Sequence, residues 1–328
     1  MTDSANNLDG MSARALLLLL PFLIPVLPSA AAQNAEANGA VQKLKPVLTG
    51  KSWRICEMPD LGKLAGPDKR RQNIVDHSFI QGNDGRWTLW ACLRGTAVGR
   101  LFYGWQGQSL LDGPLKETGV VARADERSGE TTKPAEAIQA PYFARDGDRF
   151  LCFYNSNGTR LMISTDGHTY QRGHPAGGSN HLYANGGRDV MLMRHDGLWW
   201  AYSTISTVDG RGYIILRTSK DLREWTAAKI VCEGGRGGTG RVSAESPFVL
   251  RHGGAFYLFR ASSNDGKTYV YRSEVPDYFG VNDDSGLVAV LPLKAPEILH
   301  QDGKWLISDL ADFQGIKLHE FEWKPTVE

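Results

Sequence analysis

Apolar runs and short polar turns alternate along most of this chain, and one unit of that alternation recurs five times. The copies open at different residues: Ser78, Pro141, Val190, Pro247 and Pro296. An aromatic residue follows nine positions after the opening residue in every copy. Asp-Gly or Gly-Gly pairs stand between the two apolar runs, and they favour β-hairpin turns because both residue types accept positive φ. The pattern therefore predicts five β-hairpins at intervals of roughly 50 to 65 residues.

The strand after each turn, such as residues 150–154 or 256–259, is aromatic and apolar on both of its faces. Strands of this composition are buried between two neighbouring sheets. A third strand is predicted in each unit, at residues 100–105, 159–164, 212–218, 268–273 and 315–323. A β-sandwich, the alternative, gives no reason for an aromatic residue at one fixed offset in five copies. The sequence therefore predicts an all-β fold, a five-bladed β-propeller of four-stranded antiparallel blades.

The N-terminal region has the pattern of an export signal. Arg14 precedes an apolar run over residues 15–27, and small residues follow at 29–32. This order predicts a signal peptide over residues 1–32 and a secreted or periplasmic protein. An uncleaved N-terminal anchor is the alternative, although the apolar run is short for a membrane span. Residues 33–51 are predicted to be a flexible linker, and the propeller domain is expected over residues 52–328.

Charge and cysteine content narrow the choice of partner. The chain has 37 Lys and Arg residues against 36 Asp and Glu residues. This balance argues against nucleic acid as the main partner and gives no support for binding to an anionic membrane, so a neutral or small partner is expected. The oligomeric state stays open. Export would permit disulfides, but the four cysteines lack Cys-x-x-Cys spacing, so bridges and free thiols are both left open.

The innermost strands of a propeller line its central channel, so residues that enter these strands converge on one pocket. The two positions before each aligned run are Asp76-His77, Gln139-Ala140, Arg188-Asp189, Glu245-Ser246 and Lys294-Ala295. Three blades thus contribute a carboxylate, and mutual repulsion can keep one such group protonated near neutral pH. A protonated carboxylic acid that faces an ionised one is the pair that cleavage of a glycosidic bond requires. A turn cap at Asp76 and an Arg188–Asp189 ion pair are the structural alternatives.

Four segments resemble motifs of glycoside hydrolase family 43, and one of them also resembles the related family 32. Residues 245–248, Glu-Ser-Pro-Phe, are similar to the Glu-x-Pro motif of the fourth blade. Residues 188–190, Arg-Asp-Val, are similar to the Asp-Pro or Arg-Asp-Pro motif that both families carry on the third blade. Residues 139–141, Gln-Ala-Pro, resemble a Trp-Ala-Pro motif, and residues 219–225 resemble a Ser-x-Asp-Leu-x-x-Trp turn. The resemblance spans roughly residues 73–323.

This resemblance implies a secreted glycoside hydrolase that acts on a carbohydrate substrate. It implies that Asp76 is the catalytic base, Asp189 an orienting carboxylate and Glu245 the general acid. Inverting enzymes hold acid and base about 6.5–9.5 Å apart, whereas in a retaining, fructosidase-like enzyme of family 32 Asp76 would be a nucleophile about 5–5.5 Å from the acid. No cofactor is expected, because the sequence contains no dedicated metal cage, although the resemblance allows a structural calcium ion near the axis.

The first blade departs from the family pattern. Its motif in both families is Asp-Pro, whereas here His77 stands at the position of the Asp, with Asp76 one residue earlier and Ser78 in place of the Pro. A one-residue bulge would return Asp76 to the pocket. Without such a bulge, His77 would line the axis. The departure supports the alternative of a carbohydrate-binding propeller without catalysis.

Polar residues around the axis are predicted to contact the sugar. They are His77, Arg94, Gln139, Asn155, Arg188, Arg260 and Lys294. A glycoside phosphorylase is a further alternative, in which Arg188, Arg241 and Lys294 would bind phosphate. The Gly-rich residues 234–240 lack the P-loop pattern and are predicted to form a flexible flap near Glu245.

Overall fold

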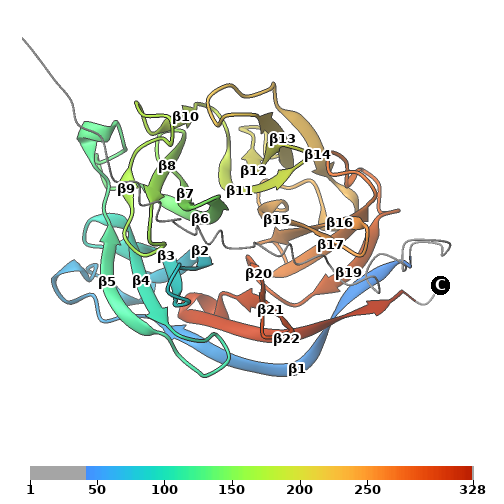
Figure 1. Cartoon of the computed structure of the whole chain (residues 1–328), viewed down its shortest axis with the longest axis horizontal. Helices are drawn as coiled ribbons and strands as arrows, with labels where there is room; N and C mark the ends of the chain where they lie inside the picture. Colours follow the sequence, from blue (N-terminus) through green and yellow to red (C-terminus); the bar gives the residue numbers. More distant parts are fainter. Residues whose placement is uncertain (1–41, 327–328) are drawn as a thin grey trace, which may run out of the picture. The chain divides into compact units, whose positions relative to one another are not determined.

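The computed structural model describes residues 42–326, which form five β-sheets arranged as blades around a central axis (Figure 1). The predicted five-bladed β-propeller is therefore confirmed. The predicted signal peptide and the first part of the predicted linker lie outside the described residues. Within residues 42–326, no helix is long and apolar enough to cross a membrane.

Each blade begins with its innermost strand and extends outward. The first blade contains β2 (Asn73–Gln81), β3 (Trp87–Thr96), β4 (Gly99–Gly107) and β5 (Lys116–Ala122). The second contains β6 (Gln139–Asp146), β7 (Arg149–Asn155), β8 (Thr159–Ser164), β9 (Gln171–Arg172) and β10 (His181–Tyr183). The third contains β11 (Arg188–His195), β12 (Leu198–Ser206), β13 (Gly212–Ser219), β14 (Lys229–Glu233) and β18 (Gly280–Val281).

The fourth blade contains β15 (Glu245–His252), β16 (Ala255–Ser262), β17 (Lys267–Ser273) and β19 (Leu287–Leu291). The fifth contains β20 (Ile298–Gln301), β21 (Lys304–Asp309), β22 (Gly315–Pro325) and β1 (Leu44–Glu57). Short 3-10 helices in the connections are η2 (Gly62–Leu64), η3 (Lys69–Arg71), η4 (Glu126–Ser128), η5 (Gly235–Gly237) and η6 (Ala311–Phe313). Three blades have the predicted four strands, and the second and third blades have a fifth.

The hydrophobic core is divided into five layers, one between each pair of neighbouring blades. Each layer contains buried residues of both blades, for example Trp90 and Phe143, Phe153 and Trp199, Tyr202 and Phe256, Phe259 and Phe321, and Leu306 and Leu89 in successive layers. Every residue of β16 is buried, as expected for a strand with a sheet on each side. The predicted second strands are therefore apolar on both faces because both faces pack against other blades.

The ring is closed by the N-terminal strand. β1 pairs antiparallel with β22, from Leu44 opposite Pro325 to Glu57 opposite Gly315, so the last blade joins both ends of the described chain. This pairing corrects the predicted boundary at residue 52, because residues 44–51 belong to a strand rather than to a linker. Their local sequence mixes apolar and polar residues, and Leu44 and Leu48 pack against the core between the fourth and fifth blades.

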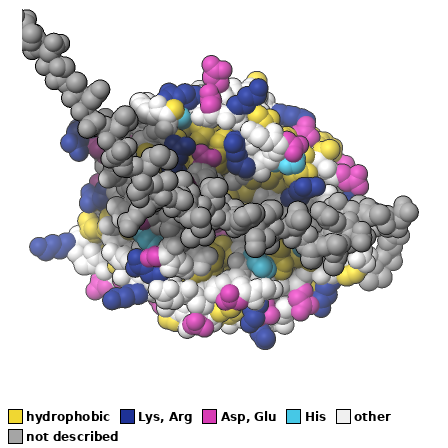
Figure 2. Space-filling model, viewed as in Figure 1, with side chains coloured by type: hydrophobic (Ala, Val, Ile, Leu, Met, Phe, Trp, Pro, Cys, Tyr) yellow, Lys and Arg dark blue, Asp and Glu magenta, His cyan; other side chains and the backbone are white. Residues whose placement is uncertain are grey.

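The cysteines and the surface charges complete this description. All four cysteines are buried free thiols in four different blades: Cys56, Cys92, Cys152 and Cys232. Of the two alternatives left open by the sequence, the structure thus has the free thiols. On the face seen in Figure 2, cationic and acidic side chains are interspersed over the described residues, in keeping with their nearly equal numbers in the chain.

Candidate active site

Every blade carries a residue with left-handed backbone where its innermost strand begins. These residues are Asp76 (φ 24°), Ala140 (φ 52°), Asp189 (φ 55°), Ser246 (φ 45°) and Ala295 (φ 48°). In the first four blades, the pairing of the innermost strand with its neighbour shifts at this residue, which is the mark of a β-bulge. Positive φ is costly for residues other than glycine and is retained mainly at functional sites. A repeated bulge at the axis therefore points to a site there.

The departure of the first blade has a simple geometric cause. Gln81 pairs with Trp87, six positions on, whereas Arg145 pairs with Phe150, five positions on, so the first hairpin turn is one residue longer. An alignment anchored on the aromatic residue therefore shifts the first blade by one position. Asp76 is the structural equivalent of Asp189 and lines the cavity, but the offset comes from the longer turn, and the bulge at Asp76 is one that the first four blades share.

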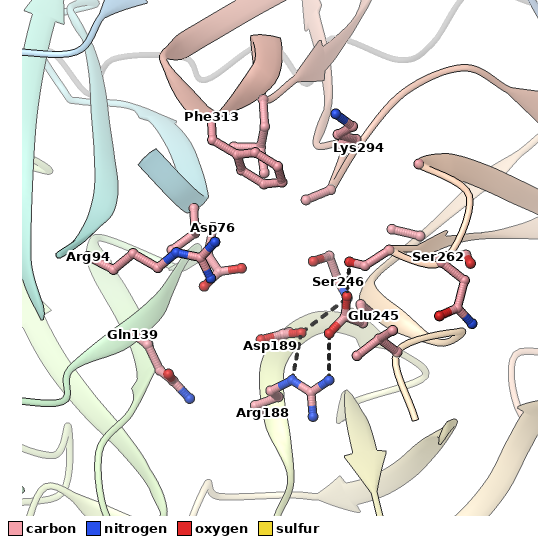
Figure 3. Close-up of a pocket in the computed structure, with 18 of the residues that line it drawn as sticks. Asp76, Arg94, Gln139, Arg188, Asp189, Glu245, Ser246, Ser262, Lys294 and Phe313 are labelled. Carbon is pink, nitrogen blue, oxygen red and sulfur yellow. Dashed lines mark hydrogen bonds and ion pairs between the residues drawn. The ribbon is translucent and has the colours of Figure 1, made fainter. Parts of the chain in front are cut away.

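The five blade entries surround one cavity of about 700 Å³ (Figure 3). Seven of the predicted site residues line it: Asp76, Arg94, Gln139, Arg188, Asp189, Glu245 and Lys294. They come from all five blades, which shows that the repeat places them rather than any one loop. The three carboxylates predicted to converge are thus in one cavity.

Glu245 and Asp189 share a cation. Arg188 Nη2 lies 2.6 Å from Glu245 Oε1, and Arg188 Nε lies 3.7 Å from Asp189 Oδ2 (Figure 3). The backbone N–H of Ser246 donates to Asp189 Oδ2 at 3.3 Å, and the hydroxyl of Ser263 donates to Glu245 Oε2. Both oxygens of Glu245 therefore have partners, and Asp189 is held beside it. The Arg188–Asp189 ion pair that sequence offered as a structural alternative exists within the site itself.

Asp76 has no such cation within ion-pair distance among the described residues. Burial is the main reason that its pKa rises to about 7, and the negative charges of Asp189 and Glu245 raise it further, while Arg100 and Arg188 oppose the rise. Burial also raises the pKa of Asp189, against the effect of Arg188. The raised pKa of Asp76 agrees with the effect expected of three converging carboxylates, although desolvation contributes more than repulsion.

Three predicted substrate-binding residues lie elsewhere, which corrects that part of the prediction. His77 Nε2 lies 2.7 Å from Ser308 Oγ beneath the cavity, and burial lowers the pKa of His77 to about 3. The Asn155 amide donates to Gly187 O at 3.3 Å and fixes the loop before β11. Arg260 is fully buried and serves the fold. Their positions at a blade entry, after a strand or in a polar loop suggested contact with the sugar, but none of the three lines the cavity.

Arg260 also corrects the predicted flexible flap. Its guanidinium donates to the carbonyls of Ser243 (2.9 Å), Gly234 (3.1 Å) and Gly238 (2.5 Å). A Cβ at Gly237 would lie 2.9 Å from Arg260 Cζ, so only glycine fits this close approach. Residues 234–240 are thus a loop wrapped around a buried cation.

Several lining residues were not predicted. They are Arg100 on β4, Phe313 in η6 and the turn between β16 and β17, residues 262–266. Phe313 lies in a connection outside the five-fold repeat, so the alignment could not reveal it. Arg100 opens a predicted third strand, and only the packing of blades shows that this end of the strand faces the axis.

A smaller cavity of about 30 Å³ lies on the axis, lined by Asp76, His77, Asp189 and Glu297 among others. Ser78 Oγ donates to Glu297 Oε2 at 3.0 Å, and burial raises the pKa of Glu297 to about 8. Calcium takes six to eight oxygen ligands. Within residues 42–326, no three or more His, Cys, Asp or Glu side chains are grouped to hold a metal ion, so these residues do not form a calcium cage. A calcium ion near the axis stays a prediction from the family resemblance.

Comparison with known proteins shows which solved structures share this fold. No protein-family model and no curated protein matches the sequence. Among solved structures, the chain is similar to a thermostable family-43 glycoside hydrolase, with 15% identity over 80% of this chain and 92% of the other and a TM-score of 0.58. It is also similar to an endo-1,4-beta-xylanase from Bacteroides thetaiotaomicron, with 16% identity over 78% of this chain and 96% of the other and a TM-score of 0.59.

The likeness extends to the second family that the motifs resemble. A family-32 beta-fructofuranosidase from Bombyx mori is 15% identical over 83% of this chain and 65% of its own length, with a TM-score of 0.56. Identities this low establish the fold, and the repeated bulge and its carboxylates are features of this chain's own structure. The chain therefore has the five-bladed β-propeller fold of solved glycoside hydrolases of families 43 and 32.

Proposed function

We propose that this protein is a secreted or periplasmic glycoside hydrolase that cleaves O-glycosidic bonds in a poly- or oligosaccharide. The observation that carries the proposal is the cavity in which Asp76, Asp189 and Glu245 converge from three blades, where burial raises the pKa of Asp76 to about 7. A carboxylic acid and a carboxylate in one cavity are the groups that glycoside hydrolysis requires. Solved proteins of the same fold bear the names xylosidase, xylanase and fructofuranosidase, which supports the same assignment.

In the proposed inverting reaction, Glu245 donates its proton to the leaving glycosidic oxygen. A water molecule adds to the anomeric carbon from the opposite face, and Asp76 takes a proton from that water. Arg188, held by Asp189, orients Glu245 at 2.6 Å. One turnover thus leaves the proton on Asp76 and a negative charge on Glu245, and the proton returns to Glu245 before the next.

Burial raises the pKa of Asp76 to about 7 in the free cavity, so the proposed base must give up this proton before it can take one from water. Arg188 lies 2.6 Å from the proposed acid, Glu245, and positions it. The alternative of a propeller without catalysis loses its main support, because Asp76 occupies the bulge after all. The phosphorylase alternative needs Arg188, Arg241 and Lys294 to bind phosphate. Lys294 lines the cavity, but Arg188 already faces two carboxylates and Arg241 is not part of the lining, so only one of the three cations fits that role.

Turnover of a substrate panel tests the proposal. Aryl arabinosides, xylosides and galactosides and a fructan are incubated with the protein, with and without phosphate. We expect hydrolysis that does not depend on phosphate, and a fall of about 10²–10⁴-fold in Glu245→Gln, because the proton donor is lost. Glu224→Gln, at an exposed turn, is the matched control and should keep full activity.

NMR of the first product tests the stereochemistry. An inverted anomer supports Asp76 as the base, and a retained anomer would assign it the role of nucleophile. Binding of these sugars without turnover of any of them would contradict the hydrolase proposal and favour the binding propeller.

A further inference from the structure

One side of the cavity is lined by cations around an aromatic ring. Arg94 Cζ lies 5.8 Å and Lys294 Nζ 5.1 Å from the centre of the Phe313 ring, and Arg100 lines the same cavity from β4. Figure 3 shows Phe313 between Arg94 and Lys294, across the cavity from Gln139 and Arg188. These groups come from the first and fifth blades, whereas Glu245 and its partner Arg188 come from the fourth and third.

Arg94 is held in place without being neutralised. Its Nε and Nη2 donate to Asn73 Oδ1 at 3.2 and 3.1 Å, and Asn73 Nδ2 donates to the carbonyl of Gln72 at 2.7 Å, which fixes the orientation of the amide. Within residues 42–326, no carboxylate lies within ion-pair distance of Arg94. A neutral amide thus positions a guanidinium whose charge stays available to a ligand.

The other two cations are also poorly neutralised among the described residues. Lys294 has one ion pair there, at 3.5 Å to Asp312, whose side chain is 95% exposed, and such pairs contribute little in water. Arg100 has no ion pair within residues 42–326, and its charge is felt inside the cavity, where it opposes the rise in the pKa of Asp76. Arg188, by contrast, faces two carboxylates.

The ring at the centre of this group is carried by strained backbone. Ala311, Asp312 and Phe313 have φ of 39°, 59° and 64°, three successive residues in the left-handed region. Such strain is retained mainly where it positions a functional group. Here it presents an aromatic ring, a surface on which sugar rings pack, between two cations at the edge of the cavity.

We propose that Arg94, Arg100, Lys294 and Phe313 form a subsite for a sugar unit that carries a negative charge, either a uronic acid carboxylate or a sulfate ester. A guanidinium and an ammonium recognise such groups through charged hydrogen bonds, and Phe313 would pack against the ring. A neutral sugar would cover the same cations without neutralising them, so the subsite discriminates against it. That the charged sugar unit is part of a substrate rests on the proposed hydrolase function. Binding of a charged sugar to the subsite does not depend on that function.

Calorimetric titration of the full chain at low salt tests the subsite. The probes are D-glucuronate, D-galacturonate and D-glucose 6-sulfate, each against neutral D-glucose or D-galactose. We expect the charged sugars to bind at least about tenfold more tightly than their neutral counterparts. That preference should fall below about twofold in Arg94→Gln/Lys294→Gln and should shrink in the wild type as salt is raised.

The double variant Arg127→Gln/Lys133→Gln is the matched control. It removes the same two charges from side chains that are 92% and 83% exposed and outside the cavity lining, and it should keep the preference. Arg94→Lys/Lys294→Arg, which keeps both charges, should retain most of it. If the melting curve shows that the glutamine variant does not fold, the subsite is tested by two other results: the salt dependence of the wild type and the preference retained by the charge-conserving variant.

Equal binding of charged and neutral sugars, no binding of any charged sugar, or an unchanged preference in the glutamine variant would overturn the subsite. Preference for the carboxylates identifies a uronic acid, and preference for the sulfate identifies a sulfate ester. A charge preference without turnover of any glycoside would support the subsite while contradicting the hydrolase. Turnover without a charge preference would contradict the subsite alone.

Discussion

Asp76 and Asp189 occupy the same bulge position in two blades, yet their neighbours differ. Asp189 has Arg188 at 3.7 Å and a backbone N–H at 3.3 Å, whereas Asp76 is influenced by cations only from further away. Two equivalent carboxylates in one desolvated cavity cannot both ionise freely, so the less supported one keeps the proton. Asp76 and Asp189 therefore differ because of their local partners rather than their positions in the fold, and the pKa of Asp76 rises to about 7.

The first prediction concerns this proton. Catalysis by an acid and a base together needs one proton on the pair of Asp76 and Glu245, so kcat/KM should fall about tenfold per pH unit above the pKa of about 7, where that proton is lost. Asp189→Asn removes a negative charge that raises that pKa, so it should move the falling limb to lower pH. A pH–rate profile for each protein measures both effects.

Asp265→Asn is the control for this profile. Asp265 lines the same cavity but is not among the groups that raise the pKa of Asp76, so the limb should stay in place. A kcat/KM that stays level or keeps rising as the pH passes through 7 would contradict a catalytic proton shared by Asp76 and Glu245.

At the scale of the element, the loop over residues 234–240 is organised by one buried side chain. Arg260 on β16 is fully buried and donates to two carbonyls of this loop, those of Gly234 and Gly238, and to the carbonyl of Ser243, so it replaces the core that such a Gly-rich segment cannot form. Because Ser243 leads directly to Glu245, the same hydrogen bonds hold the entry of β15. Arg260 thus acts on the site through the loop and has no place in the cavity.

The second prediction follows from this arrangement. Arg260→Lys keeps the charge but cannot serve three carbonyls in one plane, so it should lower the free energy of unfolding by about 3 kcal/mol. Urea titration measures the change. Arg70→Lys, at a side chain that is 91% exposed, should leave stability unchanged. Loss of sugar binding or turnover in Arg260→Lys with unaltered stability would show instead that Arg260 contacts the ligand.

At the scale of the whole molecule, the cavity depends on closure of the ring. β1 and β22 join the first and last parts of the described chain in one blade, and this blade supplies Lys294 and Phe313 to the cavity. An open ring would expose the edge of β22 and leave the fifth and first blades free to separate. The pairing of two terminal strands therefore fixes the width of the site.

The third prediction tests this closure. A chain that begins at residue 52 lacks the pairs from Leu44 to Leu48 with β22, and it should melt roughly 5–10 °C below a chain that begins at residue 42. Thermal unfolding of the two chains compares them, and light scattering should show greater association of the shorter one. Equal melting temperatures would show that residues 44–51 contribute nothing to closure.

The sequence by itself determined the blade number, the positions of the second and third strands and the three carboxylates at the axis. It could do so because a repeated hairpin imposes one local pattern five times, and alternation and turn chemistry are properties of neighbouring residues. Even the offset at Asp76 was visible as a departure, although its cause, one extra residue in the first turn, shows only in the strand pairing.

Tertiary structure alone decided the remaining features. Residues 44–51 of β1 follow a polar segment and carry no hairpin pattern, so sequence predicts a linker there, and only their pairing with the distant β22 makes them part of a strand. Burial of Arg260, His77 and Asn155, and exposure of Arg94 and Lys294 to the cavity, depend on which blade faces which. Desolvation, the main cause of the raised pKa of Asp76, has no counterpart in the linear chain, since it is produced by residues that meet only when the ring closes.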